Sequence, residues 1–450
     1  MTNAERAAQR VYDELLLRVG EAHPRPRIEP VRRLAELAGT PQLSYPVIQI
    51  AGTNGKTSTS RAIESLLRAH GLRTGLFTSP HLVSFTERFQ LDGEAVHGNQ
   101  LADAWDELRL PLQVVDAELE AAGQGPITFF EALAVLAFVL FADAPVEAAV
   151  IEVGMGGEWD ATNIADATVA VFTPIDLDHT AILGGDVAEI ARTKAGIVKA
   201  GSVVVTAVQQ PAAVAEIIEA AEEANAHLFI AGRDFALLDD RLAVGGRQID
   251  VRGFHGHVYD PAFVPLFGHY QAENVALAIA AVEAFLGGER PIPEEVLDEG
   301  LGRLTSPGRL QLIGTEPTVY VDAAHNPHGA EALARAVAES FNFSALALVV
   351  GSLADKETAR VFEELAPIAD VVYVTPVDSP RTLPVAELVE LAEGAFLDLP
   401  VEETANLAEA LEVAREWAVK DQRRAVLVVG SVLLAGEAIA HARAEGWGLV

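Results

Sequence analysis

Cysteine is absent from this chain of 450 residues, so disulfides and thiol chemistry are excluded. Long apolar runs are absent too: none approaches the roughly 20 residues needed to cross a bilayer. The N-terminus, MTNAERAAQRVYDELLLRVG, carries mixed charges and lacks the apolar core of a signal peptide. It reads as an amphipathic helix. We therefore expect a cytoplasmic protein without membrane association.

Positive charge is also scarce, because the formal net charge is −33 and only five of the 32 basic residues are lysines. Such a chain repels nucleic acid, and no basic stripe or interleaved aromatic patch is visible in the sequence. Any site for an anionic substrate must therefore be locally positive. The length predicts two or three domains, with a large core because half of the residues are hydrophobic.

One stretch organises the rest of the chain. Val47 to Ile50 is a short apolar run typical of a buried strand, and Ser58 to His70 has helical spacing of its apolar residues. Between them lies GTNGKT, so the order is strand, glycine loop, Lys-Thr and helix. In that layout, backbone N–H groups and the helix N-terminus bind phosphate oxygens, Lys56 adds charge, and the Thr57 hydroxyl is suited to Mg²⁺.

The match to the general phosphate-loop pattern is incomplete. The pattern GxxxxGK[ST] requires glycine at position 50, where this chain has Ile50. The alternative, a plain glycine turn between strand and helix, leaves Lys56 unexplained in a chain so poor in lysine. We therefore expect phosphate binding by a loop of consecutive residues, which are Gly52, Thr53, Asn54, Gly55, Lys56, Thr57 and Ser58.

Strands and helices alternate after position 47, which predicts an α/β fold with a mainly parallel sheet covered on both faces. Residues 235–267 break the rhythm with short alternating runs and predict a small antiparallel insert. Thr305-Ser306-Pro307-Gly308 is the best linker. We therefore predict an ATP-binding domain over residues 1–305 and a smaller Rossmann-like α/β domain over residues 306–450.

Polar residues stand at the ends of several predicted strands, where ligands collect in parallel sheets. Glu152 ends the apolar run AAVIEV, which favours a partner or a metal over a carboxylate turned to solvent. Asp178-His179 follows the next strand, and by itself such a pair is usually a turn or a cap. Lys194, taken alone, has the simpler interpretation of a solvated lysine.

Other candidates are equally open when each is considered alone. Ser79 and Arg88 read as loop residues, and Asn274 near the start of a helix reads as a surface residue. Asn326-Pro327 fits a helix cap, which leaves the neighbouring Asp322 and His325 unexplained.

Ten motifs taken together resemble one family. GTNGKT, TSPHL, TERF, IEVGMGGEWDATN, LDHTAILG, IARTKAGIVKAG, FGHYQAEN, SPGRL, DAAHNPHG and GSVLLAGE follow one another in family order from about position 30 to the C-terminus. The chain thus resembles the folylpolyglutamate synthase/dihydrofolate synthase family of the Mur ligase superfamily. Three positions depart from the commonest family pattern: Thr57-Ser58 replaces Gly-Ser, Glu158 replaces arginine and Ala323 replaces glycine. We expect the Ala323 replacement to be tolerated if the φ of that residue is negative.

The resemblance implies a two-domain, monomeric enzyme that binds ATP and Mg²⁺ at two sites, with Mn²⁺ as an alternative ion. It implies catalytic roles for Lys56, Lys194 and His325, with Lys194 carbamoylated. The implied metal residues are Thr57, Ser79, Glu152, His179 and Lys194. The implied ATP contacts outside the loop are Asn274, Arg309, Asp322 and His325, and the implied substrate residues are Arg88, Phe129 and Ser431.

The chemistry implied by the resemblance is amide ligation. ATP phosphorylates the carboxylate of a folate or dihydropteroate, and the amino group of L-glutamate displaces phosphate from the acyl phosphate. Two alternatives stay open. A peptidoglycan Mur ligase needs a nucleotide-sugar domain before the phosphate loop, and only 51 residues precede Gly52. A nucleotide-dependent binding protein without ligase activity would hydrolyse ATP slowly, whether or not folates are present.

Overall fold

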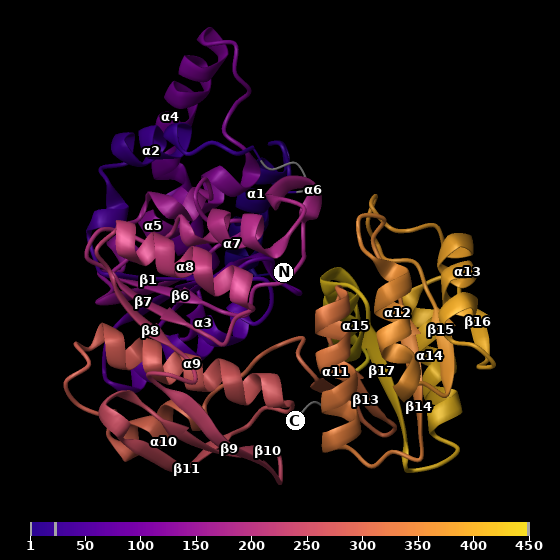
Figure 1. The fold of residues 1–450 in the computed structure, drawn as a ribbon. Helices are drawn as coiled ribbons and strands as arrows, with labels where there is room; N and C mark the ends of the chain where they lie inside the picture. Colours follow the sequence, from indigo (N-terminus) through magenta and orange to yellow (C-terminus); the bar gives the residue numbers. More distant parts are fainter. Residues whose placement is uncertain (1, 22–24, 448–450) are drawn as a thin grey trace. The chain divides into compact units, whose positions relative to one another are not determined.

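The computed structural model describes residues 2–21 and 25–447, which form two compact units (Figure 1). Unit 1 comprises Met1–Pro265 and Gln271–Leu304. Unit 2 comprises Leu266–Tyr270 and Thr305–Val450. The main part of the second unit thus begins at the Thr305 linker, and the unit also includes Leu266–Tyr270, which overlaps the end of the predicted insert.

A large sheet forms the centre of unit 1, as the alternating pattern predicts. Its strands are β1 (Val47–Ala51), β2 (Thr74–Phe77), β3 (Phe89–Leu91), β4 (Glu94–Ala95), β5 (Ala148–Glu152), β6 (Val169–Phe172), β7 (Val203–Thr206) and β8 (His227–Ile230). In the described part of the unit their order is β4-β3-β2-β5-β1-β6-β7-β8. The six strands from β2 to β8 pair in parallel, whereas β3 and β4 add an antiparallel edge. Strand β1 is therefore central, between β5 and β6.

Helices cover both faces of this sheet. The connecting segments fold as helices because apolar residues recur at helical spacing and polar residues cap the ends; Thr128, for example, accepts a hydrogen bond from the Glu131 N–H and forms a capping box. The helices are α1 (Asn3–Leu16), α2 (Glu29–Leu37), α3 (Lys56–Ala69), α4 (Gly98–Ala121), α5 (Phe129–Asp143), α6 (Thr180–Leu183), α7 (Val187–Ala195), α8 (Pro211–Glu223), α9 (His269–Phe285) and α10 (Glu294–Gly302).

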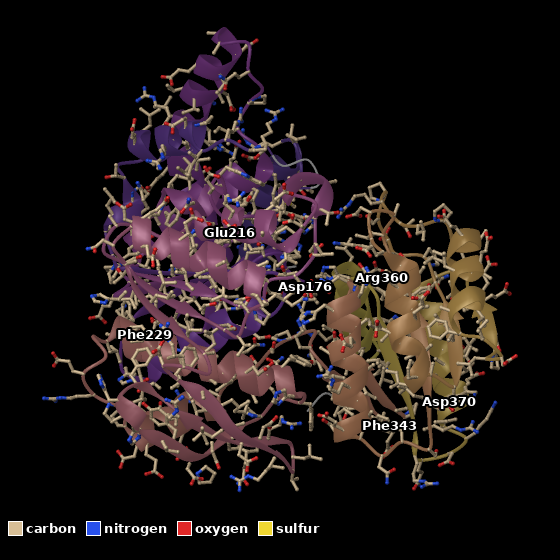
Figure 2. All side chains as sticks on the ribbon, in the orientation of Figure 1. Asp176, Glu216, Phe229, Phe343, Arg360 and Asp370 are labelled. Carbon is tan, nitrogen blue, oxygen red and sulfur yellow. The ribbon has the colours of Figure 1, made fainter. Side chains whose placement is uncertain are left out.

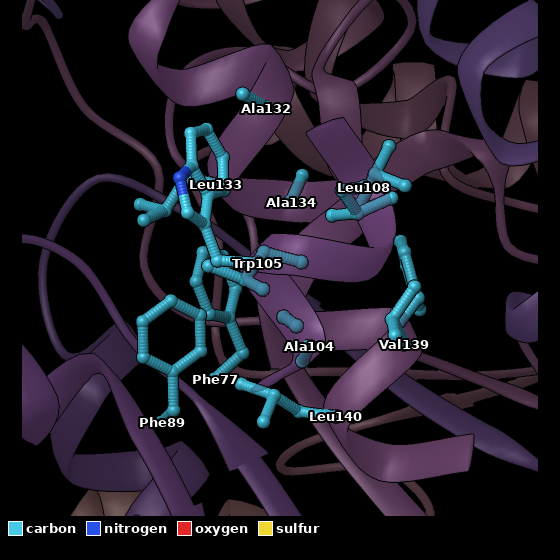
Figure 3. Packing of buried hydrophobic residues seen from close by; sticks show 14 of the residues in the cluster. Phe77, Phe89, Ala104, Trp105, Leu108, Ala132, Leu133, Ala134, Val139 and Leu140 are labelled. Atoms are coloured by element: carbon cyan, nitrogen blue, oxygen red, sulfur yellow. The ribbon is translucent and has the colours of Figure 1, made fainter. Parts of the chain in front are cut away.

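Two apolar clusters fill the space between helices and sheet. The larger one joins α1, α2, α4 and α5 to one side of the sheet, and Phe77, Phe89 and Trp105 are among its buried members (Figure 3). The smaller one lies under α7 and α8 and contains Phe172 and Ile190. Burial on both faces explains why the central strands are apolar throughout rather than alternating.

Within the range predicted for the insert, residues 236–264 contain a three-stranded antiparallel sheet of order β11-β10-β9. Phe229 of β8 stacks on Phe254 with ring centroids 4.1 Å apart, which joins the insert to the edge of the large sheet (Figure 2). The strands are β9 (Ala236–Ala243), β10 (Gly246–Arg252) and β11 (Val258–Val264).

Unit 2 is a smaller α/β body around its own sheet and apolar core. Its elements are β12 (Gln311–Thr315), β13 (Thr318–Val321), α11 (Pro327–Ser340), β14 (Ala345–Val350), α12 (Thr358–Leu365), β15 (Val371–Val374), α13 (Val385–Ala395), β16 (Val401–Glu403), α14 (Leu407–Ala418), β17 (Arg424–Val429) and α15 (Val432–Ala444). The strand order is β12-β13-β17-β14-β15-β16, parallel except for β12.

A search of the described helices in both units finds none that is long and apolar enough to cross a membrane.

Candidate active site

The loop after β1 has the backbone geometry of a tight phosphate-binding turn. Gly52 has φ +151°, and a Cβ there would lie 1.9 Å from Thr173 Oγ1. Gly55 has φ +87° and caps α3, and a Cβ there would lie 2.5 Å from Asn274 Oδ1. No larger residue fits at either position without displacement of its neighbour. The first turn of α3 therefore leaves its backbone N–H groups at a loop that only glycines can form.

Side chains hold this loop from two sides. The Lys56 ammonium donates to the carbonyl oxygens of Gly52 and Thr53, both at 3.2 Å. The Thr53 hydroxyl donates to the Asp176 carbonyl at 2.9 Å and accepts from the Asp176 N–H at 3.0 Å; Figure 2 labels Asp176. The loop is thus fixed to the segment that follows β6, and Lys56 lies over the turn where a phosphate would bind.

Glu152 is buried at the carboxyl end of β5 and turns toward the loop rather than to solvent. The Thr57 hydroxyl lies 2.9 Å from both of its carboxylate oxygens, and the Ser79 N–H lies 3.4 Å from Oε2. Parallel pairing of β1 and β5 brings these residues together, because both strands end at the same edge of the sheet. The alternative of a solvated Glu152 is therefore wrong.

Lys194 is buried in α7, and its Nζ lies 2.8 Å from the Gly52 carbonyl oxygen. The interpretation as a solvated lysine is therefore wrong. Burial, and next the charge of Lys56, lower the pKa of Lys194 to about 7, while Asp178 and Asp160 oppose the change. An amine with this pKa is substantially uncharged at neutral pH, unlike an ordinary lysine.

His179 stands at the start of the short helix α6 with φ +51°, and its Nε2 lies 3.8 Å from Asp178 Oδ2. The Asp178 carboxylate also accepts the His179 backbone N–H at 2.9 Å. His179 is the N-cap residue of α6, but its side chain makes no capping hydrogen bond. Asp178 also lies within electrostatic reach of Lys194, so α6 and α7 contribute to the same region of unit 1.

The donor set fits a hard cation only in part. A hydroxyl and a carboxylate, as in Thr57 and Glu152, are ligands that Mg²⁺ accepts. Lys194 as an amine is not such a ligand, and it fits only after conversion to an oxygen donor. Within residues 2–21 and 25–447, no group of three or more His, Cys, Asp or Glu side chains is arranged to hold a metal.

Asn274 is buried in α9 and packs directly on the loop at Gly55, so the surface interpretation is wrong. Its amide donates to Gln271 Oε1 at 3.3 Å. The Gln271 side chain is itself buried, and its amide nitrogen has no hydrogen-bond partner among the described residues. The sequence analysis did not single out Gln271. Its position in the FGHYQAEN motif, about one helical turn before Asn274, could have indicated that the two side chains lie side by side.

Arg88 is almost completely buried and is already engaged. Its terminal nitrogens lie 2.6 and 3.0 Å from the two carboxylate oxygens of Glu21, and its Nε donates to His81 Nδ1 at 2.9 Å. The guanidinium carbon lies 5.5 Å from the ring centroid of Phe129, and Tyr12 contacts the Phe129 ring edge-on. The predicted substrate residues Arg88 and Phe129 are therefore neighbours, and Glu21 is a member of this cluster that the sequence did not reveal.

His81 in this cluster is neutral at physiological pH. Burial, and next the neighbouring Arg88 guanidinium, lower the pKa of His81 to about 3. Its Nδ1 therefore accepts the hydrogen bond from Arg88 without competition from a proton.

In unit 2, Asp322 is buried at the end of β13 and accepts the N–H groups of Leu310 and Ala324, each at 2.8 Å. Burial raises the pKa of Asp322, and the Arg309 guanidinium, 4.0 Å away, opposes the change. His325 Nδ1 lies 2.9 Å from the Ala323 carbonyl oxygen. Three of the predicted ATP residues thus form one local group.

Capping explains two further residues of unit 2. Asn326 accepts the Gly329 N–H at 2.8 Å and begins α11, as its cap interpretation predicts. Ser431 is buried and accepts the Leu433 N–H at the start of α15. Ala323 has no positive φ, so its replacement of glycine needs no strained backbone. Glu158, the other departure, has an exposed side chain and a backbone N–H bonded to the Thr193 carbonyl at 2.8 Å.

Comparison with known proteins identifies the family. Residues 50–282 match the Mur ligase middle domain, and residues 308–432 match the Mur ligase glutamate ligase domain. A dihydrofolate synthase/folylpolyglutamate synthase of Mycobacterium tuberculosis is 40% identical over an alignment of 441 residues, which covers 92% of this chain and 90% of the relative. The chain belongs to the folylpolyglutamate synthase/dihydrofolate synthase family of Mur ligases.

Solved structures of relatives have the same fold. A folylpolyglutamate synthase of Mycobacterium tuberculosis, complexed with ADP and AMPPCP, aligns with a TM-score of 0.92 at 39% identity and covers 97% of this chain and 98% of its own. Escherichia coli FolC, in complex with DHPP and ADP, aligns with a TM-score of 0.84 at 28% identity and covers 98% of both chains. Both cover nearly the whole of this chain, so the family relation spans both units.

Proposed function

We propose that this protein is an ATP-dependent ligase that joins L-glutamate to the carboxylate of a folate or of dihydropteroate. The main support for the proposal is that several polar side chains meet at the loop after β1. Lys56 lies over this loop, Lys194 reaches it from α7, and the Thr57–Glu152 pair lies beside it. Phosphoryl transfer needs positive charge and a hard-cation site at one place. At this loop Lys56 brings the charge, and Thr57 with Glu152 brings oxygen donors that a hard cation accepts.

In the proposed reaction, ATP transfers its γ-phosphoryl group to the acceptor carboxylate, and ADP leaves. The amino group of glutamate then attacks the acyl carbon, phosphate leaves, and an amide forms. Lys56 and the N–H groups at the start of α3 would hold the phosphates, with Asn274 against the loop. We further propose that Arg309, Asp322 and His325 contact the nucleotide and that Ser431 takes part in glutamate binding.

The proposed metal residues rest on the family resemblance, which the oxygen donors of Thr57 and Glu152 support. Thr57, Ser79 and Glu152 would hold one Mg²⁺ or Mn²⁺, and His179 with modified Lys194 would hold a second. Bound Mg²⁺ neutralises charge on the transferring phosphoryl group. The uncharged Lys194 amine would form a bond to CO₂ and lose a proton, which leaves an anionic carbamate. Incubation with ¹³CO₂ should give a carbamate signal in the wild-type protein and none in Lys194→Met.

The deciding experiment measures ATP- and Mg²⁺-dependent incorporation of labelled glutamate, with dihydropteroate and tetrahydrofolate as separate acceptors. Incorporation with one or both supports the proposal and shows whether the enzyme has one activity or two. Incorporation with a muropeptide precursor alone would instead favour a peptidoglycan ligase. ATP hydrolysis that neither glutamate nor folates change would point to a binding protein without ligase activity.

Two parts of the proposal concern the protein in the cell. We propose a cytoplasmic location, which the lack of cysteine supports. We also propose that the enzyme acts as a monomer, which light scattering on the purified protein checks. A dimer at assay concentrations would overturn that part without affecting the assignment of the reaction.

A further inference from the structure

Arg61 lies on α3 four residues after Thr57, just over one turn and about 6 Å farther along the helix axis. Its Nε is buried and has no hydrogen-bond partner within residues 2–21 and 25–447. No hydrogen bond or ion pair in this part of the chain includes its guanidinium group. Arg68 on the same helix behaves differently, because it donates to Glu64 at 3.0 Å. Arg61 is therefore the arginine of α3 that is held beside the phosphate loop without a fixed partner.

The charges that surround Arg61 are carboxylates that accept hydrogen bonds from other groups. Burial lowers the pKa of Arg61, and the charges of Glu87, Glu152 and Glu64 oppose that change in decreasing order. Glu87 accepts the backbone N–H groups of residues 82–84, and Glu152 accepts the Thr57 hydroxyl. Arg61 is thus within electrostatic reach of both Glu152, which accepts the Thr57 hydroxyl, and Glu87 in the segment after β2, and its buried Nε has no partner in the described part of the chain.

A guanidinium group only donates, and its planar fork of N–H groups matches two oxygens of a carboxylate or a phosphate. A buried donor without a partner is costly, so an oxyanion that reaches this position is stabilised. Two oxyanions take part in the proposed reaction at this end of the sheet. The phosphates of ATP have the N-terminus of α3 and Lys56. Arg88, the arginine that the resemblance assigns to the substrate, is already paired with Glu21, so the acceptor carboxylate still needs a cationic partner.

We propose that Arg61 binds the acceptor carboxylate and presents it to the γ-phosphoryl group. This inference rests on the proposed ligase function and adds a substrate-binding residue to it. Arg61 would keep the carboxylate beside the Thr57–Glu152 pair, so that its oxygen approaches the phosphorus from the side of the loop after β2. Its loss should then weaken acceptor binding and leave nucleotide binding largely intact.

The test compares Arg61→Met and Arg61→Lys with the matched control Arg68→Met, which removes the same charge from the same helix. Steady-state KM values are measured separately for the acceptor and for ATP. Loss of a charge-assisted hydrogen bond should raise the acceptor KM about tenfold or more in Arg61→Met, with a smaller rise in Arg61→Lys. The ATP KM should change less than about twofold, and Arg68→Met should leave the acceptor KM near that of the wild type.

A second readout separates binding from folding. Added methylguanidinium should restore turnover to Arg61→Ala and should not affect Arg68→Met, a rescue that a purely structural role would not give. An unchanged acceptor KM in Arg61→Met, or a rise confined to the ATP KM, overturns the inference while wild-type ligation stands. Absence of ligation by the wild-type enzyme with either acceptor instead overturns the proposed function, so the two failures are distinguishable.

Discussion

Replacement of Lys194 by methionine tests the electrostatics of the candidate site without an activity assay. Methionine keeps much of the side-chain length and removes the charge that α7 buries against the Gly52 carbonyl. The experiment uses metal-free protein in CO₂-free buffer, so that Lys194 is present only as ammonium or amine. Urea unfolding followed by circular dichroism then gives the stability of wild type and variant at each pH.

The magnitude follows from the pKa. In the unfolded chain Lys194 has the ordinary lysine pKa of 10.5, and burial with the nearby Lys56 lowers it to about 7 in the folded protein. This gap corresponds to roughly 5 kcal/mol of unfolding free energy. Below pH 7 both states are protonated, and the folded protein carries the full cost of the buried charge. Between pH 7 and 10.5 the unfolded chain binds more protons, so wild-type stability rises with pH.

The variant has no such titration, so the difference between the two proteins should change with pH. Relative to Lys194→Met, the wild type should gain about 1.4 kcal/mol per pH unit across this window, up to roughly 5 kcal/mol. A constant offset, from the lost hydrogen bond to Gly52 or from altered packing, does not affect this slope. Parallel stability curves from about pH 7 to about pH 10 would refute the reasoning, because Lys194 would then be charged in both states or neutral in both.

Two further predictions concern the loop and the Arg88 cluster. Gly55→Ala and Gly71→Ala both place a side chain at positive φ, which should cost about 1–2 kcal/mol of stability in each variant. Only the Gly55→Ala side chain clashes with Asn274. The ATP affinity, measured by calorimetry, should therefore fall at least about tenfold in that variant alone. Equal affinities would contradict the loop assignment. Glu21→Gln leaves the buried Arg88 guanidinium without its carboxylate and should lower the unfolding free energy by about 1–3 kcal/mol, whereas exposed Glu29→Gln should change it by less than about 0.5 kcal/mol. Equal effects would show that the Glu21–Arg88 pair contributes no stability.

Local pattern predicts the centre of this fold well. The run from Val47 to Ala69 combines a buried strand, two glycines and an amphipathic helix, and the structure places β1, the loop and α3 there with boundaries shifted by one or two residues. The insert after position 235 is also predictable, because buried and more exposed residues alternate along most of β10 with the period of a strand. Short edge strands such as β4, with two residues, have no period to detect.

Contacts between distant residues are what local pattern cannot predict. Lys194 reaches a carbonyl 142 positions earlier, and nothing in the helix around it distinguishes a buried lysine from a solvated one. Glu21 pairs with Arg88 across 67 positions, and both read as ordinary charged loop residues. Both contacts depend on how whole elements pack, because Lys194 is on α7, Glu21 follows α1 and Arg88 precedes β3. The family resemblance identified Lys194 as a site residue, because a family pattern reflects contacts in the folded protein. The resemblance did not identify Glu21 or Arg61.

The acidity of the chain and the positive loop have a common physical explanation in this arrangement. With a net charge of −33, the protein repels a nucleotide at long range, yet salt screens that repulsion beyond about 10 Å. Binding therefore depends on the few cations within that distance, and two of the five lysines are there. Burial, and next the closeness of Lys56, lowers the pKa of Lys194. One of the two can then act as a cation while the other is available as an amine, so the same pairing that attracts phosphate also permits the proposed modification.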